Sequence, residues 1–140
     1  MRAKALVVDA NILIRAVLGK RVRNLIEAWC EQVVFPIPET ALAEAEENLP
    51  SLVVRRGGDP EKALALLRAL RRLGEPIGVE VYGKLEAVAR ERLGERHPED
   101  WPILATALAM GCPIWTEDTD FFGCGVATWT SSRIEIFLRE

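Results

Sequence analysis

Three acidic residues lie where the chain pattern predicts the ends of buried strands or the start of an inward-facing helix. Asp9 follows the apolar run 6–8, and Asp118 follows the run 114–116. Asp100 begins a predicted helix, on the same side as its apolar residues. Functional groups in an open α/β sheet gather beyond the carboxyl ends of the strands, so these acids are expected to meet. Clustered carboxylates repel one another unless a cation is bound, and oxygen ligands without histidine or thiolate favour Mg²⁺ or Mn²⁺.

The chemistry that such a site favours is hydrolysis of a phosphodiester bond. A divalent ion can activate water for attack on phosphorus and stabilise charge on the leaving oxygen. The sequence offers no recognisable Ser/His/Asp arrangement that would replace the ion with a nucleophilic side chain. Another chemistry would use Asp9 as a covalent nucleophile. That chemistry commonly needs a second aspartate two positions later, where this chain has Asn11, so the sequence disfavours it.

Each acid also has a structural explanation when taken alone. Asp9 could cap the helix that starts at Asn11, and Asp100 could cap its own helix. Asp118 could form an Asx-turn within a loop. Capping acids are common, so a single one would be interpreted as structural. Their joint placement at strand and helix ends favours the functional interpretation.

The elements that position these acids alternate between strands and helices. Strands are expected at 5–8, 33–35, 113–116 and 126–129, with a short strand at 77–81 that could instead be an irregular lead into the next helix. Helices are expected at 11–18, 22–29, 38–49, 60–73, 84–93 and 98–110, with Pro50 kinking or restarting the third. This alternation predicts an α/β layered fold with a parallel sheet, in one domain over residues 1–140.

Composition limits the class of protein. The chain has 140 residues, of which 49% are hydrophobic and 28% charged, the balance of an ordinary globular domain. No signal peptide is expected, because the first apolar stretch carries Asp9 and no cleavage site follows. The longest uncharged run, 101–115, is too short to span a bilayer. The three cysteines lack C-x-x-C spacing and are expected to be reduced, and His97 is expected in a surface loop. These features predict a cytoplasmic protein with no membrane association.

Three segments together resemble the PIN domain, the nuclease fold of VapC-type toxins in toxin-antitoxin pairs. They are VVDANILIRAVLG at 7–19, PETALAEAEENL at 38–49 and EDWPILATALAMGCPIWTEDTDFFG at 99–123. The resemblance covers nearly the whole chain, and the first and last segments are specific as a pair. It implies a three-layer α/β/α fold with a central, mainly parallel sheet of four to five strands.

The resemblance also implies roles for individual residues. The four catalytic metal ligands would be Asp9, Glu44, Asp100 and Asp118. A fifth acid, Asp120, would assist in binding the metal, and two polar residues, Asn11 and Thr116, would line the pocket. Helical periodicity excludes Glu47 as the second acid but does not choose between Glu44 and Glu46. The family pattern chooses Glu44.

By the same resemblance, the chain is expected to be an Mg²⁺- or Mn²⁺-dependent endoribonuclease that cuts RNA and acts as the toxin of a toxin-antitoxin pair. The expected partners are RNA, a second copy in a homodimer, and a small antitoxin whose segment blocks the acidic site. The alternative is a catalytically idle PIN domain that binds RNA or another protein. That alternative predicts a missing acid, and all four positions are filled.

The net charge of −3 does not by itself suggest a nucleic-acid partner. It becomes +1 once the four expected catalytic acids are neutralised by metal. Of the 18 basic residues 14 are arginine, whose forked side chain suits phosphate. Basic clusters occur at 20–23, 55–56, 68–72 and 90–96. They fit two explanations equally well: phosphate binding, or solvated helix faces with i,i+4 ion pairs. The four tryptophans are interpreted as core residues rather than as stacking or dimer contacts.

Overall fold

The computed structural model describes residues 4–140. Within them the strands are short and every pairing is parallel. The strands are β1 (Lys4–Ala5), β2 (Val7–Val8), β3 (Val33–Val34), β4 (Pro36–Pro38), β5 (Glu75–Ile77), β6 (Ile114–Trp115) and β7 (Thr128–Trp129). They pair as β1-β3, β2-β6-β7 and β4-β5.

These groups are connected through two single residues, Leu6 between β1 and β2 and Phe35 between β3 and β4. The Leu6 N–H donates to the Val34 carbonyl at 3.0 Å, and the Glu75 N–H donates to the Phe35 carbonyl at 2.8 Å. One chain segment supplies β1 and β2, and another supplies β3 and β4. The strands therefore form one layer in the segment order 75–77, 33–38, 4–8, 114–115 and 128–129.

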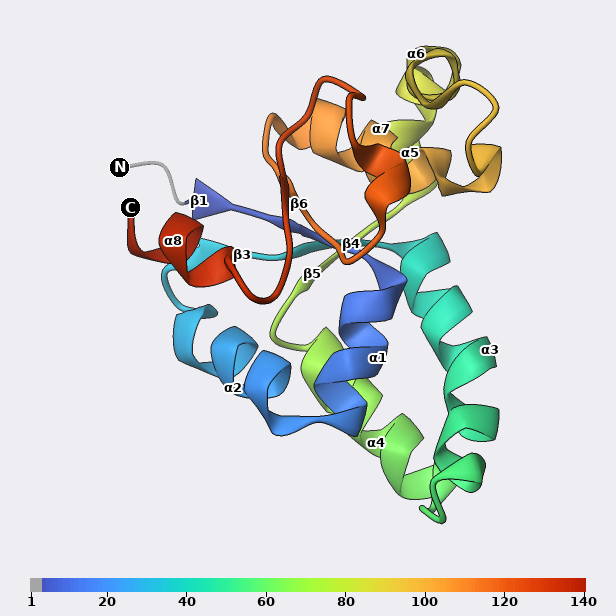
Figure 1. Ribbon diagram of the computed structural model, residues 1–140, viewed down its shortest axis with the longest axis vertical. Coiled ribbons are helices and arrows are strands. Elements are labelled where there is room, and N and C mark those ends of the chain that lie inside the picture. Colours follow the sequence, from blue (N-terminus) through green and yellow to red (C-terminus); the bar gives the residue numbers. More distant parts are fainter. Residues whose placement is uncertain (1–3) are drawn as a thin grey trace.

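Helices cover both faces of this layer. The α-helices are α1 (Ala10–Leu18), α2 (Lys20–Trp29), α3 (Glu39–Arg55), α4 (Pro60–Arg71), α5 (Val79–Tyr82), α6 (Glu86–Leu93), α7 (Trp101–Met110) and α8 (Ile134–Arg139). Short 3₁₀ turns occupy Gly83–Leu85, Pro98–Asp100 and Thr119–Phe121. Figure 1 shows α1 to α4 below the strands and α5, α6 and α7 above them. The predicted α/β/α layering with a parallel sheet is confirmed.

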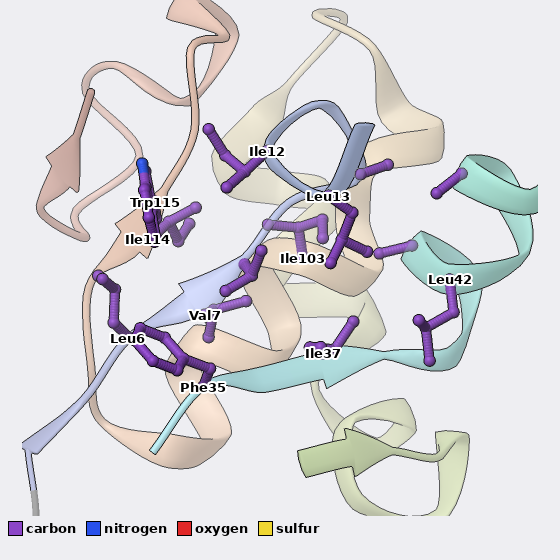
Figure 2. Close-up of a cluster of buried hydrophobic side chains, with 14 of the residues drawn as sticks. Leu6, Val7, Ile12, Leu13, Phe35, Ile37, Leu42, Ile103, Ile114 and Trp115 are labelled. Carbon is purple, nitrogen blue, oxygen red and sulfur yellow. The ribbon is translucent and has the colours of Figure 1, made fainter. Parts of the chain in front are cut away.

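The core lies where α1 and α7 sandwich the central strands. Figure 2 shows Val7, Trp115, Ile12 of α1 and Ile103 of α7 among the side chains of one buried cluster. The sequence of α7 is apolar on almost every side, and residues 102–107 are all buried, as expected of a helix packed between a sheet and other helices. This packing fixes the carboxyl ends of β2 and β6, where two of the predicted acids follow.

Several elements differ from the sequence expectation. The strand expected at 77–81 lies at 75–77, because Gly78 ends it and caps α5. Pro50 does not restart the third helix, since α3 continues to Arg55. Its fixed φ suits a helix, and the hydrogen bond it forfeits belongs to the carbonyl of the exposed Glu46. The last strand is shorter than 126–129, and α8 follows it without having been predicted.

The cysteines and tryptophans have structural positions. All three cysteines are free thiols, and burial raises the pKa of Cys112 to about 11, which keeps that thiol protonated. Trp115 is fully buried, and the other three tryptophans are partly buried against the core. Across residues 4–140, no helix combines the length and apolar character needed to cross a membrane.

Candidate active site

Asp9 is the most firmly held of the predicted acids. It follows β2 and is 6% exposed. Its Oδ1 accepts the Ala10 N–H at 2.7 Å, which caps α1. Its Oδ2 accepts the Thr116 hydroxyl at 2.7 Å and the Asn11 amide at 3.1 Å. Parallel pairing of Val8 with Trp115 puts Asp9 and Thr116 at the same end of adjacent strands, so one side chain reaches the other.

The loop after β6 is fixed to the same two polar residues. Thr116 Oγ1 accepts the Asp118 N–H at 2.9 Å, and Asn11 Oδ1 accepts the Glu117 N–H at 3.3 Å. Asp118 Oδ1 accepts the Asp120 N–H at 2.9 Å, which is an Asx-turn. Thr116 and Asn11, expected to line the pocket, therefore connect Asp9 to the segment that bears Asp118.

Asp100 lies at the start of α7 and is half-buried. Unlike Asp9 and Asp118, it does not use its side chain as a cap, and within residues 4–140 its carboxylate neither accepts a hydrogen bond nor pairs with a cation. Burial, followed by the negative charges of Asp9, Asp118, Glu99 and Glu44, raises the pKa of Asp100 to about 7. The capping explanation therefore does not hold for this residue.

Glu44 approaches this group from α3. Partial burial, followed by the charges of Asp9, Glu99 and Glu47, raises the pKa of Glu44. Burial and the charge of Asp118 also raise the pKa of Asp9, against the opposing effect of its hydrogen bonds. The α3 acid whose charge reaches Asp100 is Glu44. Four acids from separate segments of the chain thus act on one another electrostatically.

Asp120 lies at the edge of the group, beside a histidine that was not predicted to belong there. His97 Nε2 is 2.9 Å from Asp120 Oδ2, and its Nδ1 is 3.1 Å from Glu99 Oε1. Ligand atoms of His97, Asp100 and Asp120 lie within 4.8 Å of one another. The Glu99 hydrogen bond and then the charge of Asp120 raise the pKa of His97. The histidine is exposed, as expected of a loop residue, yet it contacts the acidic group.

Comparison with known proteins identifies the family. A family model described as the PIN domain matches residues 7–139. The chain belongs to the PIN domain family. The resemblance seen in the sequence is thereby confirmed, and with it the fold that it implied. None of the curated proteins compared matches the sequence.

Several solved structures share the PIN fold. PAE2754 from Pyrobaculum aerophilum has a TM-score of 0.71 at 19% identity, covering 98% of this chain and 90% of that one. VapBC2 from Rickettsia felis, bound to a promoter DNA fragment, has a TM-score of 0.66 at 17% identity, covering 90% and 98%. A toxin-antitoxin complex from Klebsiella pneumoniae has a TM-score of 0.63 at 20% identity, covering 90% and 97%. At these identities the likeness establishes the fold.

One further acid of this PIN domain, Glu117, makes its side-chain contacts outside the group of four acids. Its Oε1 accepts the Ser131 N–H at 2.7 Å. Burial favours a higher pKa, but the hydrogen bonds from Ser131 and the charge of Arg15 outweigh it, so the pKa of Glu117 is lowered. Glu117 therefore anchors the turn after β7, whereas the neighbouring Asp118 faces the acidic group.

The residues present suit a hard divalent ion. Asp9, Asp118, Asp100 and Glu44 offer only carboxylate oxygens, the ligands that Mg²⁺ and Mn²⁺ prefer. Burial, and after it the charges of neighbouring acids, raises the pKa of Asp9, Glu44 and Asp100, and the Asp100 carboxylate has no hydrogen bond or ion pair within the described residues. A bound cation would remove this repulsion. Among the described residues, the ligand atoms that already lie close enough together to share one ion are those of His97, Asp100 and Asp120, so Asp100 is the one of these four acids in that group.

Proposed function

We propose that this PIN domain is a metal-dependent endoribonuclease that hydrolyses phosphodiester bonds in RNA. The ligands proposed for Mg²⁺ or Mn²⁺ are Asp9, Glu44, Asp100 and Asp118, with Asp120 assisting. The observation that carries the proposal is the unpaired, half-buried Asp100, whose pKa is raised first by burial and then by the charges of four other acids, three of them proposed ligands. Acids that only capped helices would not need to converge in this way.

The chain's own groups divide into fixed and adjustable ligands. Asp9 is held by three hydrogen bonds, and Asp118 is held through its backbone by Thr116 and through its side chain by the Asp120 N–H. Asp100 has no such restraint within residues 4–140, so its carboxylate can adjust to a ligand. When bound, a divalent ion supplies a Lewis acid that activates water and offsets charge on the leaving oxygen. The surrounding carboxylates would bind the ion and orient it toward an RNA phosphate.

We further propose that the enzyme is the toxin of a toxin-antitoxin pair and forms a homodimer. The toxin-antitoxin part of this proposal is supported by the structural neighbour from Klebsiella pneumoniae, which is a toxin-antitoxin complex. The proposed antitoxin is a small protein, one segment of which would cover the acids and exclude RNA.

The test is cleavage of a mixed pool of structured RNA by the purified protein in Mg²⁺, in Mn²⁺ and in chelator. We expect cutting that needs metal and is lost in Asp100→Asn, while the matched variant Glu95→Gln cuts like wild type. Glu95 is exposed and makes no ion pair within the described residues. Mn²⁺ binding is measured on the same samples.

Two results would contradict the proposal. Absence of Mn²⁺ binding would remove the site itself. Mn²⁺ binding without cleavage of any RNA in the pool would favour an idle PIN domain that binds RNA or another protein.

A further inference from the structure

A basic hollow of about 770 Å³ lies next to the acidic group. It is bounded by the end of α1, the start of α2, the end of α3 and the turn after β7. Its charged lining consists of four cations and one acid, namely Arg15, Lys20, Arg21, Arg56 and Glu117. The hollow is therefore strongly positive in a chain whose overall charge is −3.

Three of these cations make no hydrogen bond or ion pair through their side chains within residues 4–140, although the charge of Arg15 acts on Glu117. Arg21 is held by the Ser131 carbonyl at 3.0 Å and lies 3.6 Å from Glu135. Arg15, Lys20 and Arg56 are exposed and form no ion pair or side-chain hydrogen bond within residues 4–140. The explanation of the basic clusters as helix faces with i,i+4 ion pairs fits Arg90 with Glu86, but Lys20 and Arg56 form no such pair.

The hollow shares a wall with the acidic group. Glu117 lines the hollow, while its N–H donates to Asn11, which in turn donates to Asp9. Arg15 lies one helical turn beyond Asn11 on α1 and therefore on the same side of that helix. The Glu117–Asn11 and Asn11–Asp9 hydrogen bonds connect the lining of the hollow to Asp9.

The start of α2 adds to the attraction for an anion. Its N-cap is Gly19, which has no side chain to accept the first N–H groups, and Lys20 is the first helical residue. Free N–H groups at a helix N-terminus favour a phosphate. Here they open beside three unpaired cations, two of them arginines, whose forked donors match phosphate oxygens.

We propose that this hollow binds a backbone phosphate of the RNA strand next to the phosphate that is cut. The inference rests on the proposed function and deepens it, because the hollow would set the path of the strand across the acids. Contacts of this kind fix position and register and do not read sequence. Binding there should therefore depend on salt and not on the bases.

The test measures binding separately from cleavage. A fluorescein-labelled single-stranded RNA of twelve nucleotides is titrated in Mg²⁺ and several KCl concentrations, with Asp100→Asn present in every protein so that the RNA stays intact. The test variant adds Lys20→Gln and Arg56→Gln. The matched control adds Arg68→Gln and Arg71→Gln, which remove two cations from another hollow at the end of α4.

We expect the test variant to bind about tenfold more weakly and to lose about 0.7 from the slope of log K against log salt, which is the contribution of one single-strand phosphate contact. The control should keep the starting affinity and slope. Equal losses in both proteins, or no loss in either, would overturn the inference. A competition experiment compares unlabelled RNA with poly-glutamate of the same charge. If both displace the labelled RNA at the same concentration, the inference is overturned in favour of a site for an acidic protein segment.

The outcome is distinguishable from failure of the nuclease proposal. If wild-type protein cuts RNA and the test variant binds normally, the enzyme remains and the hollow has no role. If wild-type protein cuts nothing and the test variant still loses binding, the phosphate site remains without the chemistry.

Discussion

Replacing Asp100 by asparagine should stabilise the protein when metal is absent. The carboxylate is half-buried and unpaired within the described residues, and its pKa is raised to about 7 by burial and by the charges of Asp9, Asp118, Glu99 and Glu44. Asparagine has nearly the same shape and no charge. The substitution therefore removes the repulsion without opening a cavity.

The direction of the pH dependence follows from the raised pKa. Folded Asp100 binds a proton more readily than unfolded Asp100, whose ordinary pKa is 3.8. The contribution is therefore fully present below about pH 4, and the free energy of unfolding falls as pH rises toward about 7. A pKa raised this far corresponds to at most about 4 kcal/mol, and partial exposure to water screens it to about 1–2 kcal/mol.

Urea unfolding at pH 4, 6 and 8 in chelator measures this effect. We expect Asp100→Asn to match wild type at pH 4 and to exceed it by about 1–2 kcal/mol at pH 8. Glu95→Gln should follow wild type throughout. Adding Mn²⁺ at pH 8 should reverse the order, because only wild type keeps all the proposed ligands. A metal-free Asp100→Asn protein that is less stable than wild type at pH 8 would refute the reasoning.

Two other substitutions test the support beneath the acids. Thr116→Val removes the hydroxyl that donates to Asp9 and accepts the Asp118 N–H. We expect the cleavage rate to fall by about 10–100-fold and the free energy of unfolding in urea to fall by about 1 kcal/mol. An unchanged cleavage rate would mean that Thr116 does not position the ligands. Leu104→Ala, in the fully buried centre of α7, should cost about 2–5 kcal/mol in unfolding free energy while leaving Mn²⁺ affinity of the folded protein unchanged, and a lower affinity would show that core packing sets the site.

Local patterns were sufficient to predict the layered fold and the positions of Asp9 and Asp118. A buried apolar run that stops at a polar residue marks a strand end, and parallel strands bring their carboxyl ends to the same edge. The structure adds the register between Val8 and Trp115, which decides that Thr116 reaches Asp9. The sequence could not supply that register, because it depends on how the two strands pair across the sheet.

Other features depend on contacts between distant segments and have no local signal. His97 meets Asp120 only because the turn before α7 packs beside the loop after β6. The basic hollow combines Lys20 with Arg56, which are far apart in the chain. Helical periodicity left Glu44 and Glu46 as alternatives, and the position of α3 relative to Asp100 distinguishes them electrostatically. The assignment of Glu44 as a metal ligand stays a prediction.

The acids of the site differ in what they contribute to folding. Asp9 caps α1 and Asp118 closes an Asx-turn, so both serve the fold even without metal. Asp100 makes no contact of this kind within residues 4–140, and its raised pKa shows that its charge is costly there. Above about pH 7, where this carboxyl group loses its proton, its charge opposes folding unless a cation is bound. Two of the acids stabilise the fold, whereas the charge of Asp100 destabilises it. This difference is the strongest physical argument for the proposal that this PIN domain binds a cation.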